Sequence, residues 1–214
     1  FTWIGKAGDV VLNAGHDIRI ENGKITSAAL PADPDVIRNL DESQKVQVSQ
    51  CTICVGTAGN IRLNAGHDIQ VRNGQIATTS VDGSGGNIKL TAPNTIFIAN
   101  STISSSVKGQ KSSNGGNISI DPVAVAIQNS QILAQANAGA GGNITIAASG
   151  SLLVSPSSVL DASAGSAGVS GSVNINAPIQ VLGGTLVPLK VSYSQPALSG
   201  DRCAADPQGR FSSF

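Results

Sequence analysis

The chain has few of the residues on which binding and catalytic sites usually depend. Aromatic residues make up 3% of its 214 residues and charged residues 12%, and thirteen basic residues balance thirteen acidic ones. Bases and sugars therefore have almost no aromatic platform to stack on, and no excess of charge attracts a polyanion. We predict no nucleic-acid partner and no small-molecule substrate.

Methionine and long apolar stretches are also absent. No stretch of about eighteen apolar residues occurs, and no basic segment followed by an apolar one. The sequence therefore predicts neither a membrane span nor a signal peptide. The lack of methionine leads us to expect a processed piece of a longer chain.

Glycine, by contrast, is abundant, with 25 copies that mark an internal repeat. A Gly-Gly-Asn corner opens into an alternating apolar strand at 86–90, and similar markers recur along the chain. The glycine that starts each marker lies at position 8, 59, 86, 116, 142 or 171. All steps after the first have similar lengths, within the range of single units in a stacked repeat protein. The first step, from Gly8 to Gly59, is much longer and predicts an insertion.

Each repeat unit reads as three short strands. In the second unit, Ile61 and Leu63 alternate with polar residues, as do Ile69 and Val71, and this period of two is the signature of β-strands. Gly- and Asn-rich segments separate the strands, and these residues accept left-handed backbone conformations at little cost. The pattern predicts an all-β fold: a right-handed parallel β-helix of about six rungs.

The predicted domain organisation follows from the same markers. Residues 1–186 are expected to form the β-helix, and 187–214 a carboxyl-terminal tail or connecting segment. A loop insertion at about 28–55 accounts for the long first step, since it holds Pro31, Pro34 and most of the local charge.

The closing part of the sequence resembles a known family. Five segments carry the resemblance in order and spacing: VLDAS at 159–163, GSVNINAP at 171–178, GTLVPL at 184–189, RCAA at 202–205 and SSF at 212–214. Together with the repeats, they resemble the carboxyl-terminal part of a filamentous-haemagglutinin-like exoprotein of a two-partner secretion system. This resemblance implies an extracellular, cell-surface location and an outer-membrane secretion partner for the parent chain.

Two candidate side-chain clusters recur at fixed positions of the repeat. Gly-His-Asp occurs at 15–17 and again at 66–68, so both imidazoles and both carboxylates should stack on one edge. A metal site is conceivable there, but we favour a structural reading, in which a polar corner repeats because the rung repeats. The second cluster is a predicted corner ladder whose amides hydrogen-bond along the axis. It consists of Asn60, Asn87, Asn117 and Asn143.

An enzymatic function is not expected. Polysaccharide-active β-helix enzymes need paired carboxylates, but Asp121 and Asp161 are the only acidic residues between positions 83 and 200. No nucleophile–base pair is evident. We predict no catalytic residue, cofactor or metal, and we keep a polysaccharide-active enzyme as an unlikely alternative.

Three cysteines are candidates for disulfide formation: Cys51, Cys54 and Cys203. Cys51 and Cys54 could bridge each other and leave Cys203 free. Alternatively, Cys203 could reach the insertion of a neighbouring molecule. Within one molecule, about six stacked rungs would separate Cys203 from the other two by roughly 25–30 Å, too far for a disulfide.

These observations predict an extracellular structural protein whose copies stack head to tail into a fibre or matrix. Open ends of a β-helix carry unpaired backbone groups and template association. The alternative is a monomeric adhesin stalk. The predicted polymerisation residues lie near the two ends of the chain: Phe1, Thr2, Trp3, Ile4, Leu186, Val187, Leu189, Val191 and Tyr193.

Overall fold

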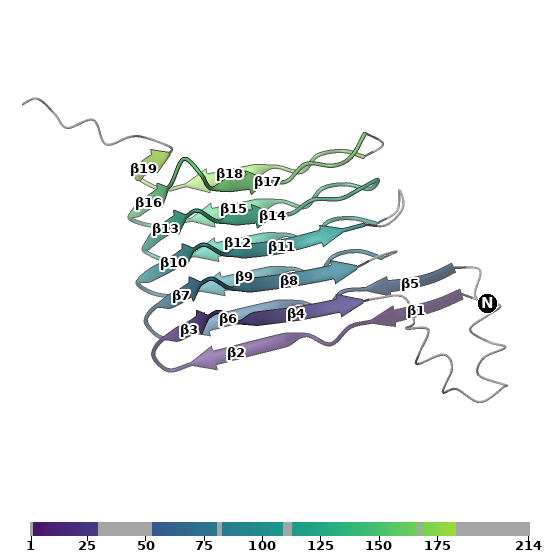
Figure 1. Ribbon diagram of the computed structural model, residues 1–214, viewed down its shortest axis with the longest axis horizontal. Coiled ribbons are helices and arrows are strands. Elements are labelled where there is room, and N and C mark those ends of the chain that lie inside the picture. Colours follow the sequence, from purple (N-terminus) through teal and green to yellow (C-terminus); the bar gives the residue numbers. More distant parts are fainter. Residues whose placement is uncertain (1, 30–52, 81–82, 109–112, 167, 183–214) are drawn as a thin grey trace, which may run out of the picture. The chain divides into compact units, whose positions relative to one another are not determined.

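The computed structural model describes residues 2–29, 53–80, 83–108, 113–166 and 168–182. These residues form nineteen strands and no helix, and every paired strand runs parallel to its neighbours. The described residues therefore form a parallel β-helix, as predicted. Figure 1 shows the strands stacked turn upon turn.

Three sheets make up the coil. The first contains β2 (Val10–Ala14), β6 (Ile61–Ala65), β9 (Ile88–Thr91), β12 (Ile118–Asp121), β15 (Ile144–Ala147) and β18 (Val173–Asn176). The second contains β3 (Ile18–Glu21), β7 (Ile69–Arg72), β10 (Thr95–Ala99), β13 (Ala124–Gln128), β16 (Ser151–Val154) and β19 (Ile179–Leu182). The third contains β4 (Lys24–Ala29), β8 (Gln75–Ser80), β11 (Thr102–Val107), β14 (Gln131–Leu133) and β17 (Val159–Asp161).

The prediction of about six rungs is slightly too high. Only five turns among the described residues contain all three strands, because the third sheet has five strands while the other two have six. The last turn is represented by β18 and β19 alone. Successive turns keep a constant register, which places equivalent residues in columns along the coil.

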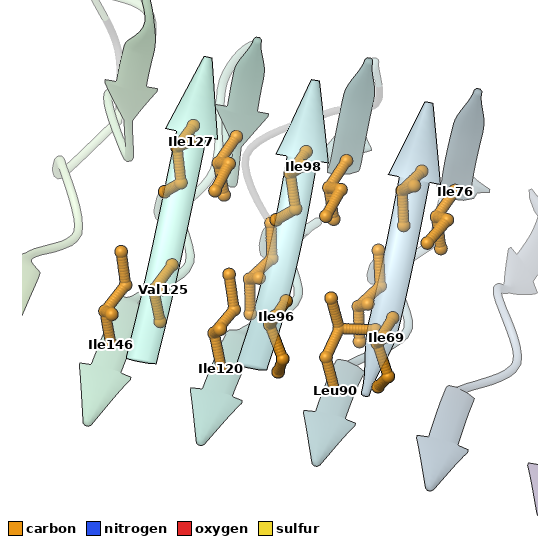
Figure 2. Close-up of a cluster of buried hydrophobic side chains, with 14 of the residues drawn as sticks. Ile69, Ile76, Leu90, Ile96, Ile98, Ile120, Val125, Ile127 and Ile146 are labelled. Atoms are coloured by element: carbon orange, nitrogen blue, oxygen red, sulfur yellow. The ribbon is translucent and has the colours of Figure 1, made fainter. Parts of the chain in front are cut away.

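The apolar columns fill the interior, as predicted from the alternation. Figure 2 shows Ile69, Ile96 and Val125 on successive strands of one sheet, with Leu90 and Ile120 on the facing sheet. Ile61, Leu63 and the equivalent residues of the next three turns all have an exposed fraction of 0%, which confirms the predicted alternation. The equivalent residues are Ile88, Leu90, Ile118, Ile120, Ile144 and Ile146.

The corner between the second and third sheets uses asparagine in the left-handed conformation. Asn22, Asn73, Asn100 and Asn129 have φ angles of 52°, 49°, 49° and 45°. Asparagine accepts this conformation more readily than most residues with a side chain. The predicted left-handed corners are thus confirmed at Asn22-Gly23 and Asn73-Gly74.

The glycine of the Gly-Gly-Asn marker is required by the close stacking of turns. A Cβ atom built on Gly116 would lie less than 3.0 Å from the main-chain oxygen of Gly86 and from Oγ of Ser105. The same backbone conflict recurs at equivalent positions along the coil. These are Gly59, Gly86, Gly142 and Gly171. The marker therefore recurs because each turn needs a residue without a side chain at this point.

The first described strand lies outside the three sheets of the coil. Thr2–Lys6 (β1) pairs with Ile53–Thr57 (β5) in a separate two-stranded sheet. β1 precedes the first turn of the coil, and β5 precedes the second. Pairing of β1 with β5, β2 with β6, β3 with β7 and β4 with β8 keeps the same sequence offset throughout.

The limits of the insertion are also narrower than predicted. Ala28 and Ala29 belong to β4, and residues 53–55 belong to β5, so neither end of the predicted range 28–55 is loop. The intervening residues 30–52 lie outside the described part of the chain. The first compact unit ends at Gly184, close to the predicted boundary at 186. No helix in the described residues is long and apolar enough to cross a membrane.

Candidate functional site

The two ends of the stacked sheets are the main candidate site. β2 and β3 begin their sheets, and β18 and β19 end them, so each has a strand neighbour on only one side among the described strands. We call the edges of β2 and β3 the amino-terminal face and those of β18 and β19 the carboxyl-terminal face. Unpaired strand edges of this kind recruit a further strand unless something covers them.

The apolar interior reaches solvent at the amino-terminal face. Leu12 occupies the same column as Leu63, yet its exposed fraction is 40% where that of Leu63 is 0%. The difference arises because Leu63 has a turn on both sides. Leu12 points into the coil but has a neighbouring turn on one side only.

The carboxyl-terminal face shows the same effect. Val173 continues the column of Ile144, which is 0% exposed, but is itself 41% exposed. Ile179, in β19, continues the outward column of Ser151 and is 62% exposed. β18 and β19 contain asparagine, glutamine and apolar residues but no charged residue. Both faces are therefore partly apolar edges with polar backbone groups along them.

The predicted asparagines do lie in one column. The side-chain oxygen of Asn60 accepts a hydrogen bond from the Asn87 N–H at 2.9 Å, and Asn87 does the same for Asn117 at 2.9 Å. Asn117 then accepts from the Asn143 N–H at 2.8 Å. Each amide thus bonds the backbone of the next turn, whereas the sequence suggested bonding between stacked amides.

Two further residues extend this ladder to the two faces. Asp9 accepts a hydrogen bond from the Asn60 N–H at 2.8 Å, and Asn143 accepts from the Ser172 N–H at 3.0 Å. Sequence reasoning missed both because it considered asparagine alone. The signal was present, since each follows the marker glycine in the looser copies at Gly8 and Gly171.

Asp9 is the charged residue of the ladder. The hydrogen bond from the Asn60 N–H holds the pKa of the Asp9 carboxyl below its usual value, and the Asn60 amide, Lys6 and Arg62 add to this effect. Lys6 lies 3.7 Å and Arg62 3.8 Å from its carboxylate oxygens. The amino-terminal face thus carries an ionised group at the corner, whereas Ser172 stands at the equivalent position of the other face.

The predicted polymerisation residues are only partly described. Thr2, Trp3 and Ile4 lie in β1, whose backbone pairs with Ile53–Val55. The remaining ones lie outside the described residues. They are Phe1, Leu186, Val187, Leu189, Val191 and Tyr193. Of the disulfide candidates, Cys54 lies in β5 opposite Trp3, and Cys51 and Cys203 are outside the described residues.

The two Gly-His-Asp corners stack directly on each other, as predicted. The rings of His16 and His67 have centroids 4.8 Å apart and planes inclined by 17°. Nδ1 of His16 lies 3.0 Å from Asp17, and Nδ1 of His67 lies 3.0 Å from Asp68. Desolvation raises the pKa of the Asp17 carboxyl, but hydrogen bonds to His16 and to the Asp68 N–H outweigh it, and the pKa lies below its usual value.

Asp121 and Asp161 lie at the ends of different strands, β12 and β17. Asp161 accepts hydrogen bonds from the Ser163 N–H at 2.8 Å and from the Gln135 amide at 2.6 Å. Contacts with Ser163, followed by Gln135, lower the pKa of the Asp161 carboxyl. A general acid in polysaccharide hydrolysis needs a raised pKa instead.

The lowered pKa of Asp161 predicts an acid-sensitive last complete turn. Because the pKa is lower in the folded chain, the carboxylate stabilises the fold above its unfolded pKa of about 3.9, and this contribution is lost as the pH falls further. We expect Asp161→Asn to lower the free energy of unfolding at pH 7 and to have a much smaller effect at pH 3. Urea unfolding at both pH values tests this, with Asp121→Asn as the control for loss of a carboxylate. An equal effect of Asp161→Asn at both pH values would contradict it.

Comparisons with known proteins identify no relative. No family model matches the chain, and no curated protein or solved structure is significantly similar to it.

Proposed function

We propose that this protein is a structural subunit whose copies stack head to tail, so that the β-helix of one continues into the next. The observation that carries the proposal is the exposure of interior columns at both faces, at Leu12 and at Val173. Joining the two faces would bury these side chains and pair the free strand edges. The contact joins two different surfaces, so it propagates into an open filament.

The register of the coil supports one arrangement of the joint. Residue columns place Val173 above Val10 and Ile175 above Leu12 if β18 of one molecule pairs with β2 of the next. Asn174 would then face Val11 on the outer side. The apolar pairs are of the same kind as Ile61 and Ile88 within the coil, so the joint reuses contacts that the fold already makes.

The polar ladder supports the same direction of stacking. Within the chain, the N–H of each ladder residue donates to the side-chain oxygen of the preceding turn. At a head-to-tail joint, the Asp9 N–H of one molecule would meet the Ser172 hydroxyl oxygen of its neighbour. That oxygen is an acceptor of the required kind. Head-to-head stacking would reverse the strand direction and lose this match.

The biological setting is a second part of the proposal. The resemblance to filamentous-haemagglutinin-like exoproteins supports a cell-surface fibre or matrix outside the cell, with an outer-membrane partner that secretes the parent chain. A disulfide from Cys203 to Cys51 or Cys54 of the next molecule would reinforce the joint. The alternative is a monomeric adhesin stalk, whose length depends on the number of turns and which needs no partner copy.

A pair of charge substitutions on β2 tests the proposed assembly. Leu12 points into the coil and Val11 points outward, yet their exposed fractions are similar, at 40% and 48%. Leu12→Glu would place a charge inside the joint, so we expect it to abolish filaments while costing the monomer about 1 kcal/mol or less. Val11→Glu is the matched control and should leave filaments intact.

Negative-stain microscopy is the readout. Native protein should form long filaments, and Leu12→Glu should leave separate short rods with an unchanged circular dichroism spectrum. Short rods from the native protein would favour the stalk. Filaments that survive Leu12→Glu, or that are lost equally with Val11→Glu, would show that the joint does not bury the interior column.

A further inference from the structure

We propose that the stacked Gly-His-Asp corners of the first two turns bind a divalent transition-metal ion through His16, Asp17 and His67. This site is separate from the assembly proposed above and does not depend on it. Within the described residues, these three side chains each place a ligand atom within 4.8 Å of the other two. The sequence alone favoured a structural role, in which a polar corner repeats because the rung repeats.

Two of the three separations between ligand atoms are close to those around a tetrahedral ion. Asp17 Oδ1 lies 3.0 Å from Nδ1 of His16 and 3.6 Å from Nδ1 of His67. An ion with bonds of about 2.0–2.1 Å to nitrogen and oxygen spaces its ligands about 3.3–3.4 Å apart in tetrahedral geometry. The two observed distances lie on either side of this value. An ion bound between the three atoms would take the place of the hydrogen bonds that now join the imidazoles to the carboxylate.

Contact across the turns distinguishes this cluster from simple repetition. Repetition alone produces two equivalent pairs, His16 with Asp17 and His67 with Asp68. The structure adds the contact of His67 with Asp17 of the preceding turn. One carboxylate is therefore shared by two imidazoles.

Hydrogen bonds from the backbone hold the carboxylates in place. Asp17 Oδ1 accepts from the Asp68 N–H at 3.2 Å, and Asp68 Oδ1 accepts from the Thr95 N–H at 2.9 Å. Outer contacts of this kind orient metal ligands. Asp68 Oδ2 lies 3.0 Å from Nδ1 of His67 and orients that ring. The side chains of His16 and His67 are 77% and 48% exposed, so an ion can enter from solvent.

The ligand set selects the class of metal. Two imidazoles with a carboxylate suit Zn²⁺ and similar ions, whereas Mg²⁺ and Ca²⁺ prefer sites made of oxygen alone. A bound ion would clamp the first turn to the second, two turns that the long step from Gly8 to Gly59 separates in the sequence. Because it binds the folded corner, it should raise the temperature of unfolding.

Isothermal titration calorimetry of the full chain with Zn²⁺ tests the proposal. We expect one equivalent to bind with micromolar affinity and no binding of Mg²⁺. His16→Gln, Asp17→Asn and His67→Gln should each weaken the affinity about tenfold or more. Asp121→Asn, which removes an exposed carboxylate elsewhere, should have no effect.

Cobalt spectroscopy separates this site from the cysteines. Co²⁺ at a nitrogen and oxygen site lacks the intense thiolate charge-transfer band that cysteine ligands produce. We expect weak tetrahedral absorption from the native protein, and its loss in His67→Gln. A thiolate band, an affinity unchanged by all three ligand substitutions, or no binding by the native chain would each overturn the proposal. Circular dichroism without metal confirms that the variants are folded.

Discussion

Replacing Ile118 by aspartate is expected to lower the free energy of unfolding by about 4 kcal/mol or more. Ile118 is fully buried in the fourth turn and stacks between Ile88 and Ile144. The substitution removes the apolar contacts with both neighbouring turns and leaves a carboxyl group without a partner. Because every turn buries its apolar face on the next, the damage should spread to the adjacent turns.

Ser119→Asp is the matched control, since Ser119 follows Ile118 in β12 but points outward and is only partly buried. We expect it to change the free energy of unfolding by about 0.5 kcal/mol or less. Urea unfolding followed by circular dichroism measures both variants. Similar stabilities for Ile118→Asp and Ser119→Asp would mean that the two faces of β12 have been assigned the wrong way round.

Replacing Gly116 by alanine is expected to cost about 3 kcal/mol or more, although it adds a single methyl group. The new Cβ would meet the main-chain oxygen of Gly86. That oxygen cannot move away without loss, because it accepts hydrogen bonds from the buried hydroxyls of Thr78 at 2.7 Å and Ser105 at 2.5 Å. Relief of the clash must separate two turns or break these bonds.

Gly15→Ala provides the control for adding a methyl group to a corner glycine. A Cβ on Gly15 has no other heavy atom within 4 Å, so we expect its thermal unfolding midpoint to match that of the native protein. Gly116→Ala should unfold at a clearly lower temperature. If the two variants proved equally stable, the close approach of turns at the marker glycine would not be what makes this residue necessary.

Much of the fold was predictable because the chain repeats. The alternation of Ile61 with Leu63 and of Ile69 with Val71 predicted which side chains point inward, and the repeat predicted that they stack. The marker predicted the phase of each turn, and its physical cause is the clash that Gly116 avoids. The pairing of β1 with β5 was not predicted, because no marker precedes either strand.

The candidate site was less predictable, because the burial of a side chain at an end of the coil depends on whether a further turn packs against it. Leu12 and Leu63 are both followed by Asn-Ala-Gly-His-Asp, yet only the structure shows that Leu12 is 40% exposed and Leu63 is buried. Repetition predicted that His16 and His67 share an edge. It did not predict that Asp17 reaches both imidazoles, because this depends on side-chain directions across two turns.

Cross-linking of two single-cysteine proteins tests the head-to-tail joint most directly. With Cys51, Cys54 and Cys203 replaced by serine, one protein carries Val11→Cys and the other Asn174→Cys. The proposed register sets these residues opposite each other on strands about 4.8 Å apart, a spacing that a disulfide can bridge. We predict that oxidation of the mixture yields a covalent heterodimer that reductant dissolves, and that neither protein alone cross-links. Absence of the heterodimer, or equal cross-linking by Val11→Cys alone, would contradict head-to-tail stacking in this register.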